Sequence, residues 1–119
     1  MTELQRAIYA LALSPEIQLG LFRDFVCKGE ELVLDFEAAY AEGLSLSLAS
    51  ASQRLAFDEL DKYLESHSGT QFQELYMDDS QLFDNVFWRR VRVLANQCIS
   101  SMGWEYQAPP KSAAIYVRG

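Results

Sequence analysis

Apolar side chains recur every three or four residues over most of the chain, which is the spacing of one face of an α-helix. The pattern predicts a first helix over residues 3–13. Ser14 and Pro15 then predict the start of a second helix, because a serine side chain can cap the first amides and proline fits the first helical turn. We expect this second helix to end near Lys28, before Gly29.

The predicted second helix carries one apolar stripe, which we expect to face the core. The members of the stripe are Ile17, Leu21, Phe22, Phe25 and Val26. The polar residues that fall elsewhere on the helical wheel are Gln18, Arg23 and Asp24. The stripe therefore predicts that Ile17 is buried and that Gln18 lies away from the core.

Two patterns overlap in residues 30–42, where some apolar positions alternate as in a strand and others follow helical spacing. A helix is favoured because three alanines near its end have high helix propensity and Gly43 supplies a left-handed cap. Residues 44–52 are rich in leucine, serine and alanine, and both a connecting loop and an early helical turn fit them.

Another helix is predicted to begin after a cap supplied by Ser50 or Ser52 and to end at residues 67–69. Its expected core face consists of Leu55, Ala56, Leu60, Tyr63 and Leu64. Thr70 and Gln73 have the spacing of a capping box, which predicts a short helix after this one.

The last predicted helix covers residues 81–102 and has the most regular apolar spacing in the chain. The apolar residues that repeat along it are Phe83, Val86, Phe87, Val91, Leu94, Ala95, Cys98, Ile99 and Met102. A turn at residues 78–80 is expected to cap its start, and Gly103 is expected to end it. At a rise of about 1.5 Å per residue it would be about 30 Å long, so we expect it to be the central packing element.

Residues 104–119 differ from the rest, because they combine aromatic residues, two adjacent prolines and a β-prone apolar run. The fold prediction is all-α: a single domain over residues 1–103, formed by a compact bundle of five or six helices with a long C-terminal helix, followed by a short extended tail. We expect the tail to pack on the domain. Contact with another chain, including a second copy in a homo-oligomer, is the alternative.

Acidic residues outnumber basic ones and are concentrated in the middle of the chain. The sequence has 17 Asp plus Glu and 10 Lys plus Arg, a formal net charge of −7. Residues 30–84 contain 13 of the acidic residues and two basic ones, a net charge of −11. Because this charge repels phosphates, a nucleic-acid partner is disfavoured. Solvated helix faces explain such a surface, and an acidic surface that meets a basic partner is the alternative.

The cysteines and the hydropathy indicate the compartment. Cys27 and Cys98 are the only two cysteines and lie far apart in apolar helical patterns, so we expect reduced core thiols. The sequence has no apolar run of membrane-spanning length and no secretory leader, which predicts a soluble, cytoplasmic protein with no membrane partner.

Residues for catalysis, metal binding or nucleotide binding are not grouped in any recognised pattern. His67 is the single histidine, so a nucleophilic triad has little support, and a structural role at a helix end is expected. Glu–His pairs at helical spacing, calcium loops and glycine-rich phosphate loops are missing from the sequence. The interpretation is a protein without a cofactor or metal that is not an enzyme.

Three arginines follow Trp88 closely in the last predicted helix: Arg89, Arg90 and Arg92. We expect their guanidinium groups to pair with carboxylates of the acidic middle and so to tie the long helix to its neighbours. Contact with an anion or a partner is the alternative.

The leading hypothesis is a non-enzymatic protein-interaction module, such as an acidic inhibitor, antitoxin or immunity-type protein, that presents carboxylates to a basic protein partner. The candidate partner-binding residues are Asp58, Glu59, Asp61, Glu65, Trp104 and Tyr106. The alternative is a helical domain that binds a small ligand or cofactor in an aromatic-lined pocket. The candidates for that lining are Tyr9, Tyr40, Tyr63, Tyr76, Trp88 and Trp104.

Overall fold

The structure is a computed structural model that describes residues 3–22, 27–47 and 50–104. These residues form an all-α bundle, as predicted, and no strand occurs among them. Its elements are α1 (Glu3–Ala12), α2 (Pro15–Leu19), α3 (Lys28–Ser47), α4 (Ala51–Ser66), the 3₁₀ turn η1 (Thr70–Phe72), α5 (Gln73–Met77), α6 (Gln81–Asp84) and α7 (Val86–Met102). The expected five or six α-helices become seven in the described ranges because the last predicted helix is divided.

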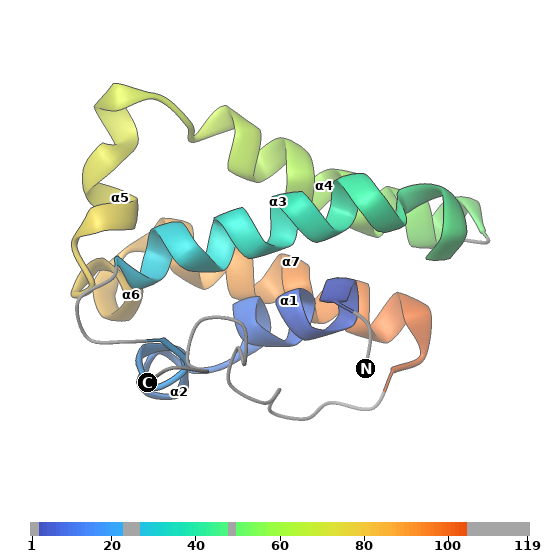
Figure 1. Cartoon of the computed structure of the whole chain (residues 1–119), viewed down its shortest axis with the longest axis horizontal. Helices are drawn as coiled ribbons and strands as arrows, with labels where there is room; N and C mark the ends of the chain where they lie inside the picture. Colours follow the sequence, from blue (N-terminus) through green and yellow to red (C-terminus); the bar gives the residue numbers. More distant parts are fainter. Residues whose placement is uncertain (1–2, 23–26, 48–49, 105–119) are drawn as a thin grey trace.

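Four longer helices enclose the core (Figure 1). α1 contacts both α3 and α7, and α7 contacts α4. Tyr40 of α3 stacks on Phe57 of α4, with the centroids of the two aromatic rings 5.9 Å apart, and this contact joins α3 to α4. The short helices α5 and α6 cover one end of this arrangement (Figure 1). α7 therefore has the central packing role that its apolar spacing predicts.

The predicted second helix is much shorter than expected. α2 ends at Leu19, and Lys28 begins α3 instead of ending α2. Gly29 lies in the first turn of α3, so its expected role as a helix end is wrong. A Cβ atom at Gly29 would lie 2.8 Å from Cζ2 of Trp88 and 3.0 Å from the Tyr76 carbonyl oxygen. The glycine is required here for close packing of helices.

The expected burial within α2 is reversed. Ile17 is 44% exposed, whereas Gln18 is fully buried. The carbonyls in the last turn of a helix have no partner within the helix, and Nε2 of Gln18 donates to those of Ala10 (2.9 Å) and Leu11 (3.2 Å). Gln18 is therefore drawn into the core because it completes the C-terminal end of α1. Phe25 and Val26 of the predicted stripe lie outside the described residues.

α3 continues to Ser47 and passes through Gly43, so the predicted cap at Gly43 is wrong. Glycine inside a helix costs only about 1 kcal/mol relative to alanine, which flanking helical residues can offset. Of residues 44–52, for which a loop and a helical turn were both considered, those up to Ser47 belong to α3, and α4 starts at Ala51.

α4 begins as predicted at a serine cap. Oγ of Ser50 accepts from the Gln53 amide, and the Gln53 side chain accepts from the Ser50 amide, both at 3.2 Å. The predicted burial of Leu55 is wrong, because this side chain is 60% exposed. Phe57, which was not part of the predicted core face, is fully buried. By contrast, the capping box expected at residues 70–73 is not formed, because Gly69 with φ 113° precedes η1 and makes no side-chain cap.

Asn85 divides the last predicted helix into α6 and α7. Its backbone is extended, and its side-chain oxygen accepts from the Phe87 amide at 2.8 Å, so Asn85 caps α7 where the turn at residues 78–80 was expected to. The break leaves Phe83 41% exposed and Val86 69% exposed, so these two members of the apolar repeat do not belong to the core. Gly103 ends α7 as predicted, with φ 69°.

Trp104 is the first residue of the predicted tail and the last one described. Its ring packs against Tyr9 and Phe57, with centroids 6.1 and 6.2 Å away. Residues 105–119 lie outside the described residues, and so the expectation that the whole tail packs on the domain stays a prediction. Among the described helices, none combines the length and the apolar character that crossing a membrane requires.

Candidate functional site

The segment formed by residues 68–77 separates two depressions of the surface. The first, called the acidic groove here, has a volume of about 240 Å³ and is lined by Glu30, Val33, Leu34, Glu37, Leu64, Ser68, Gly69, Gln73, Tyr76 and Met77. The second, called the aromatic pocket, has a volume of about 490 Å³ and is lined by Tyr63, His67, Gln71, Phe72, Glu74, Leu75, Gln81, Asn85, Val86 and Phe87.

Two hydrogen bonds hold this dividing segment in place. The Tyr76 hydroxyl donates to the His67 carbonyl at 2.6 Å, which ties α5 to the end of α4. Nε1 of Trp88 donates to the Leu75 carbonyl at 2.8 Å, which ties α5 to α7. Burial, together with the Glu37 charge and Tyr63, raises the pKa of Tyr76 to about 12, so this hydroxyl keeps its proton. Both depressions therefore share a fixed wall.

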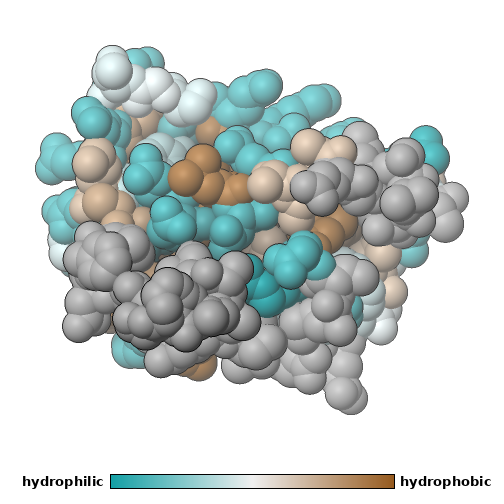
Figure 2. All heavy atoms as spheres, in the orientation of Figure 1, coloured by the Kyte–Doolittle hydropathy of each residue, from teal (hydrophilic) through white to brown (hydrophobic). Residues whose placement is uncertain are grey.

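The acidic groove has an apolar rim that is open to solvent. Leu34 of α3 is 50% exposed and Met77 of α5 is 48% exposed. Figure 2 shows hydrophobic surface on the face that α3 presents, bordered by hydrophilic side chains. An apolar surface of this kind can be buried by a partner.

Carboxylates of α3 and α4 lie close enough beside the groove to affect one another. Burial first, and then the charges of Asp61 and Glu65, raise the pKa of Glu37. Burial, Glu65 and Asp58 raise the pKa of Asp61 in the same way. These four residues are called the acidic band below. Like charges held together disfavour one another's ionised forms, so the acidic band is electrostatically unfavourable in the unbound protein.

Asp58 is fixed by a contact with α3. It accepts a hydrogen bond of 2.6 Å from the hydroxyl of Tyr40, whose ring is stacked between Phe36 and Phe57. Burial and this bond to Asp58 raise the pKa of Tyr40, so the hydroxyl remains a donor. The carboxylate at this end of the acidic band is therefore held in position.

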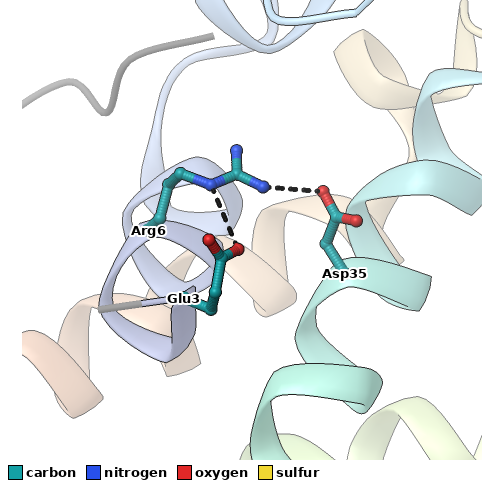
Figure 3. Close-up of polar contacts among 3 residues, drawn as sticks. All are labelled: Glu3, Arg6 and Asp35. Atoms are coloured by element: carbon teal, nitrogen blue, oxygen red, sulfur yellow. Dashed lines mark hydrogen bonds and ion pairs between the residues drawn. The ribbon is translucent and has the colours of Figure 1, made fainter. Parts of the chain in front are cut away.

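A second set of carboxylates lies where α3 meets α1. Arg6 of α1 bridges Asp35 at 3.4 Å and Glu3 at 3.6 Å (Figure 3). Burial raises the pKa of Asp35, and the opposing effect of Arg6 does not cancel this rise. Burial, Asp35 and Glu30 raise the pKa of Glu31. Repulsion among carboxylates thus extends along α3.

These raised pKa values predict an increase in stability on mild acidification. Glu31, Asp35, Glu37 and Asp61 bind protons more tightly in the folded chain than in the unfolded one. The free energy of unfolding should therefore rise as pH falls from 7 through their folded pKa values, and level off below the ordinary values of 3.8 for Asp and 4.5 for Glu. Calorimetric melting temperatures between pH 7 and pH 4.5 measure this change.

The matched variant is Glu37→Gln/Asp61→Asn, which removes two of the four carboxylates. It should melt at a higher temperature than the wild type at pH 7 and show a flatter dependence on pH. A wild-type melting temperature that falls steadily from pH 7 to pH 5 would show that carboxylate repulsion is unimportant. The pKa of Asp78 is shifted in the opposite direction, because its bonds to Ser80 lower it, so Asp78 stabilises the fold at pH 7 and this contribution is lost only as the pH falls below the ordinary value of 3.8.

The predicted site residues of α4 do not all share one surface. Asp58, Asp61 and Glu65 lie together in the acidic band. Glu59 lies on another side of α4, where burial and its charge raise the pKa of the Cys98 thiol of α7 to about 12. Trp104 is part of the aromatic packing described above, and Tyr106 lies outside the described residues. The structure therefore joins three of the six candidates.

Three residues of α3 that the sequence analysis did not select complete the groove: Glu30, Leu34 and Glu37. Their spacing of four and three residues places them on one face of a helix. The alternation of apolar residues in this region obscured that face, because Leu34 also fitted a strand pattern. With the helix established, an exposed leucine between two glutamates is the signal that identifies the groove.

The aromatic pocket is formed by the end of α4, η1, α5 and the start of α7. The imidazole of His67 has its centroid 4.5 Å from that of Tyr63, 5.2 Å from Phe72 and 5.0 Å from Phe87. Tyr63 and Phe87 are stacked at 5.5 Å. Of the six aromatic candidates for a pocket, Tyr63 lines this one and Tyr76 lines the acidic groove, while Trp88 is fully buried.

The hydrogen bonds of His67 place a proton on its Nδ1. Its Nδ1 lies 2.9 Å from the Tyr63 carbonyl, which can only accept, so Nδ1 carries the proton. The Ser66 hydroxyl donates to the same carbonyl and accepts from Nδ1 at 3.0 Å. In the neutral imidazole Nε2 is then an acceptor, and among the described residues it has no hydrogen-bond partner. This network fits the structural role expected for His67 and still leaves one nitrogen free to bind.

The arginines of α7 were expected to pair with carboxylates, but the hydrogen bonds of Arg89 and Arg92 go to other oxygen atoms. Arg92 donates to the carbonyls of Leu13 and Leu82 and, at 2.9 Å, to Oε1 of Gln18. Arg89 donates to the Asp84 carbonyl at 2.9 Å, and Arg90 is exposed. Arg92 ties the helices together through backbone carbonyls because the ends of α1 and α6 leave those oxygens unpaired.

The described residues contain no group of three or more His, Cys, Asp or Glu side chains arranged to hold a metal ion. Comparisons with protein-family models, with curated proteins and with solved structures find no match for this chain.

Proposed function

We propose that this protein is a non-enzymatic interaction module that binds a basic, amphipathic segment of a partner protein in the acidic groove. The observation that supports this most directly is the exposed pair Leu34 and Met77 lying beside the acidic band. A helix with apolar residues on one face and lysine or arginine beside them would bury the pair and neutralise the carboxylates. An acidic inhibitor, antitoxin or immunity-type protein would act in this way.

The raised pKa values of Glu37 and Asp61 support a cationic occupant. Burial and the neighbouring carboxylates make their charges unfavourable in the free protein. A cation placed between them would relieve this repulsion, so part of the binding free energy is already stored in the unbound acidic band. Complementary charge also accelerates association, because long-range attraction steers a basic partner toward the groove.

The test is capture of the partner from native cell extract, followed by measurement of association and dissociation rates. Glu37→Lys/Glu65→Lys should slow association at low salt by about tenfold or more, because charge complementarity acts mainly on the association rate. Leu34→Ser should mainly accelerate dissociation, because it removes apolar contact. Added salt should slow association of the wild type steeply.

Glu59→Lys is the matched control for the single variant Glu37→Lys, which changes the charge by the same amount, since Glu59 is an exposed carboxylate of α4 outside the acidic band. It should associate nearly as fast as the wild type, although it reduces the net negative charge. A partner whose rates are unaffected by salt and by both groove variants does not bind at the acidic groove, and that result would remove the proposal.

The alternative function, binding of a small ligand, is favoured by one observation, the aromatic pocket. Its volume of about 490 Å³ is within the range of about 300–1,000 Å³ that ligand sites occupy, and polar and aromatic groups line it together. We place either function in the cytoplasm, a proposal supported by the free thiols of Cys27 and Cys98.

A further inference from the structure

The aromatic pocket has walls suited to a flat group. Tyr63, His67, Phe72 and Phe87 provide four rings within one depression. Phe87 is 4% exposed and so is almost entirely covered, whereas Tyr63, His67 and Phe72 are partly exposed. Planar cations stack favourably on aromatic faces, and arginine does so more often than lysine.

Apart from its side-chain amides and the Tyr63 hydroxyl, the polar side chains that line the pocket, Glu74 and neutral His67, offer hydrogen-bond acceptors. Glu74 is its only carboxylate, and the described lining contains neither lysine nor arginine. In the neutral imidazole of His67, Nε2 is an acceptor because Nδ1 holds the proton. The amide of Asn85 is already occupied, since its oxygen caps α7 and its nitrogen donates to Gln81 at 2.8 Å. A ligand that enters the pocket is therefore expected to donate N–H groups and to carry positive charge.

We propose that the aromatic pocket receives the guanidinium group of an arginine side chain of the partner. This inference rests on the proposed function, because it specifies the chemistry of the basic segment that the protein binds. The guanidinium stacks on the pocket rings, pairs with Glu74 and donates to Nε2 of His67. Lysine is a poorer occupant because its compact ammonium group is strongly hydrated and cannot stack as a plane. The acidic groove lies on the other side of the segment 68–77, so the two sites contact different parts of the partner.

The test is an NMR titration of the isotopically labelled full chain with Nα-acetyl-arginine-methylamide. Saturable shifts should be concentrated in residues 63–87. The lysine and citrulline analogues are the chemical controls, and each should bind about tenfold or more weakly, because the lysine ammonium cannot stack as a plane on the rings and citrulline lacks the charge that pairs with Glu74. Equal binding of all three compounds, or shifts spread over the whole chain, would overturn the assignment.

Two variants test the residues. Glu74→Gln, at an exposed position, should weaken the arginine compound about tenfold, and Phe72→Leu should weaken it about threefold or more by removing one ring. Glu59→Gln is the control and should leave the affinity unchanged. Amide spectra that match the wild type outside the pocket show that each variant is folded. If folded Glu74→Gln binds as tightly as the wild type, the pocket does not recognise the cation.

Three further measurements separate the possible failures. Free L-arginine tests the source of the guanidinium, because affinity tenfold above that of the capped compound would indicate a free metabolite and would overturn the partner assignment. Glu37→Lys/Glu65→Lys should retain binding of the capped arginine.

Loss of partner binding in a Glu74→Gln protein with an intact groove supports the arginine anchor. Rates that depend on the groove but not on Glu74 refute the anchor and leave the proposed function in place.

Discussion

Replacement of Arg92 by methionine is expected to lower the free energy of unfolding by about 3 kcal/mol or more. Methionine keeps much of the volume of the side chain but leaves three acceptors without their donor: the carbonyls of Leu13 and Leu82 and Oε1 of Gln18. Hydrogen bonds to charged groups contribute about 1.5–3 kcal/mol each, and a buried acceptor that loses its donor has no compensating water. Chemical denaturation measures the loss.

The Arg92→Met substitution should also weaken contacts outside α7, because Gln18 connects Arg92 to the end of α1. Gln18 donates to Ala10 and Leu11 and accepts from Arg92, so one buried amide joins three helices. Gln18→Leu should therefore be destabilising even though it makes the core more apolar, and the double variant should cost less than the sum of the single ones. Non-additive values of this kind are the mark of a shared network.

Arg90→Met and Arg89→Met are the controls for Arg92. Arg90 is exposed, and Arg89 donates to one carbonyl at the surface. Exposed substitutions usually change stability by no more than about 0.5 kcal/mol. A similar loss for all three methionine variants would mean that overall charge, and not the buried network, explains the effect of Arg92.

The helices that the sequence predicts well are those with long, regular apolar spacing. The start of α4 and the end of α7 were identified because Ser50 and Gly103 act locally, through a side-chain cap and a left-handed backbone. α7 itself is recognisable because one of its faces packs on both α1 and α4. Local chemistry and one continuous core face are both visible in a single sequence.

Two of the errors arise where a distant residue determines the outcome. Ile17 and Gln18 exchange their expected places because the carbonyls at the end of α1 require a donor. Gly29 lies inside a helix, where the close approach of Trp88 leaves no room for a side chain. Asn85 interrupts an apolar pattern that continues on both sides of it, so periodicity alone gave one long helix. The partners of Gln18 and Gly29 lie elsewhere in the sequence, whereas Asn85 breaks the helix through a local cap on the Phe87 amide.

The candidate site was partly predictable for the same reason. Asp58, Asp61 and Glu65 recur at helical spacing, and the charge count identified their region. Glu37 could be added only after α3 was placed beside α4. The aromatic pocket joins α4, α5 and α7, so Tyr63 and Phe87 meet only in the folded chain.

Replacement of Gly29 by alanine is expected to destabilise the protein by about 1–3 kcal/mol, the usual cost of inserting a methyl group into a tightly packed site. The new Cβ would lie 2.8 Å from Cζ2 of Trp88, and 3.0 and 3.1 Å from the carbonyl oxygen and Cα of Tyr76. Backbone atoms and a fully buried indole cannot move aside without cost. The direction of the change in the free energy of unfolding is informative, because alanine has the higher helix propensity and would stabilise the protein if packing were unimportant.

Gly20→Ala provides the matched control for this prediction. A Cβ at Gly20 would approach nothing closer than the Ile17 carbonyl at 3.5 Å, and its φ of −80° suits any residue. That variant should be neutral or more stable by about 0.4–1 kcal/mol, because alanine reduces the freedom of the unfolded chain. Gly29→Ala should also weaken partner binding, since Tyr76 and Leu75 belong to the wall between the acidic groove and the aromatic pocket. Equal stability of the two alanine variants, by chemical denaturation, would show that α3 can move away from Trp88 and that the wall is not fixed by this contact.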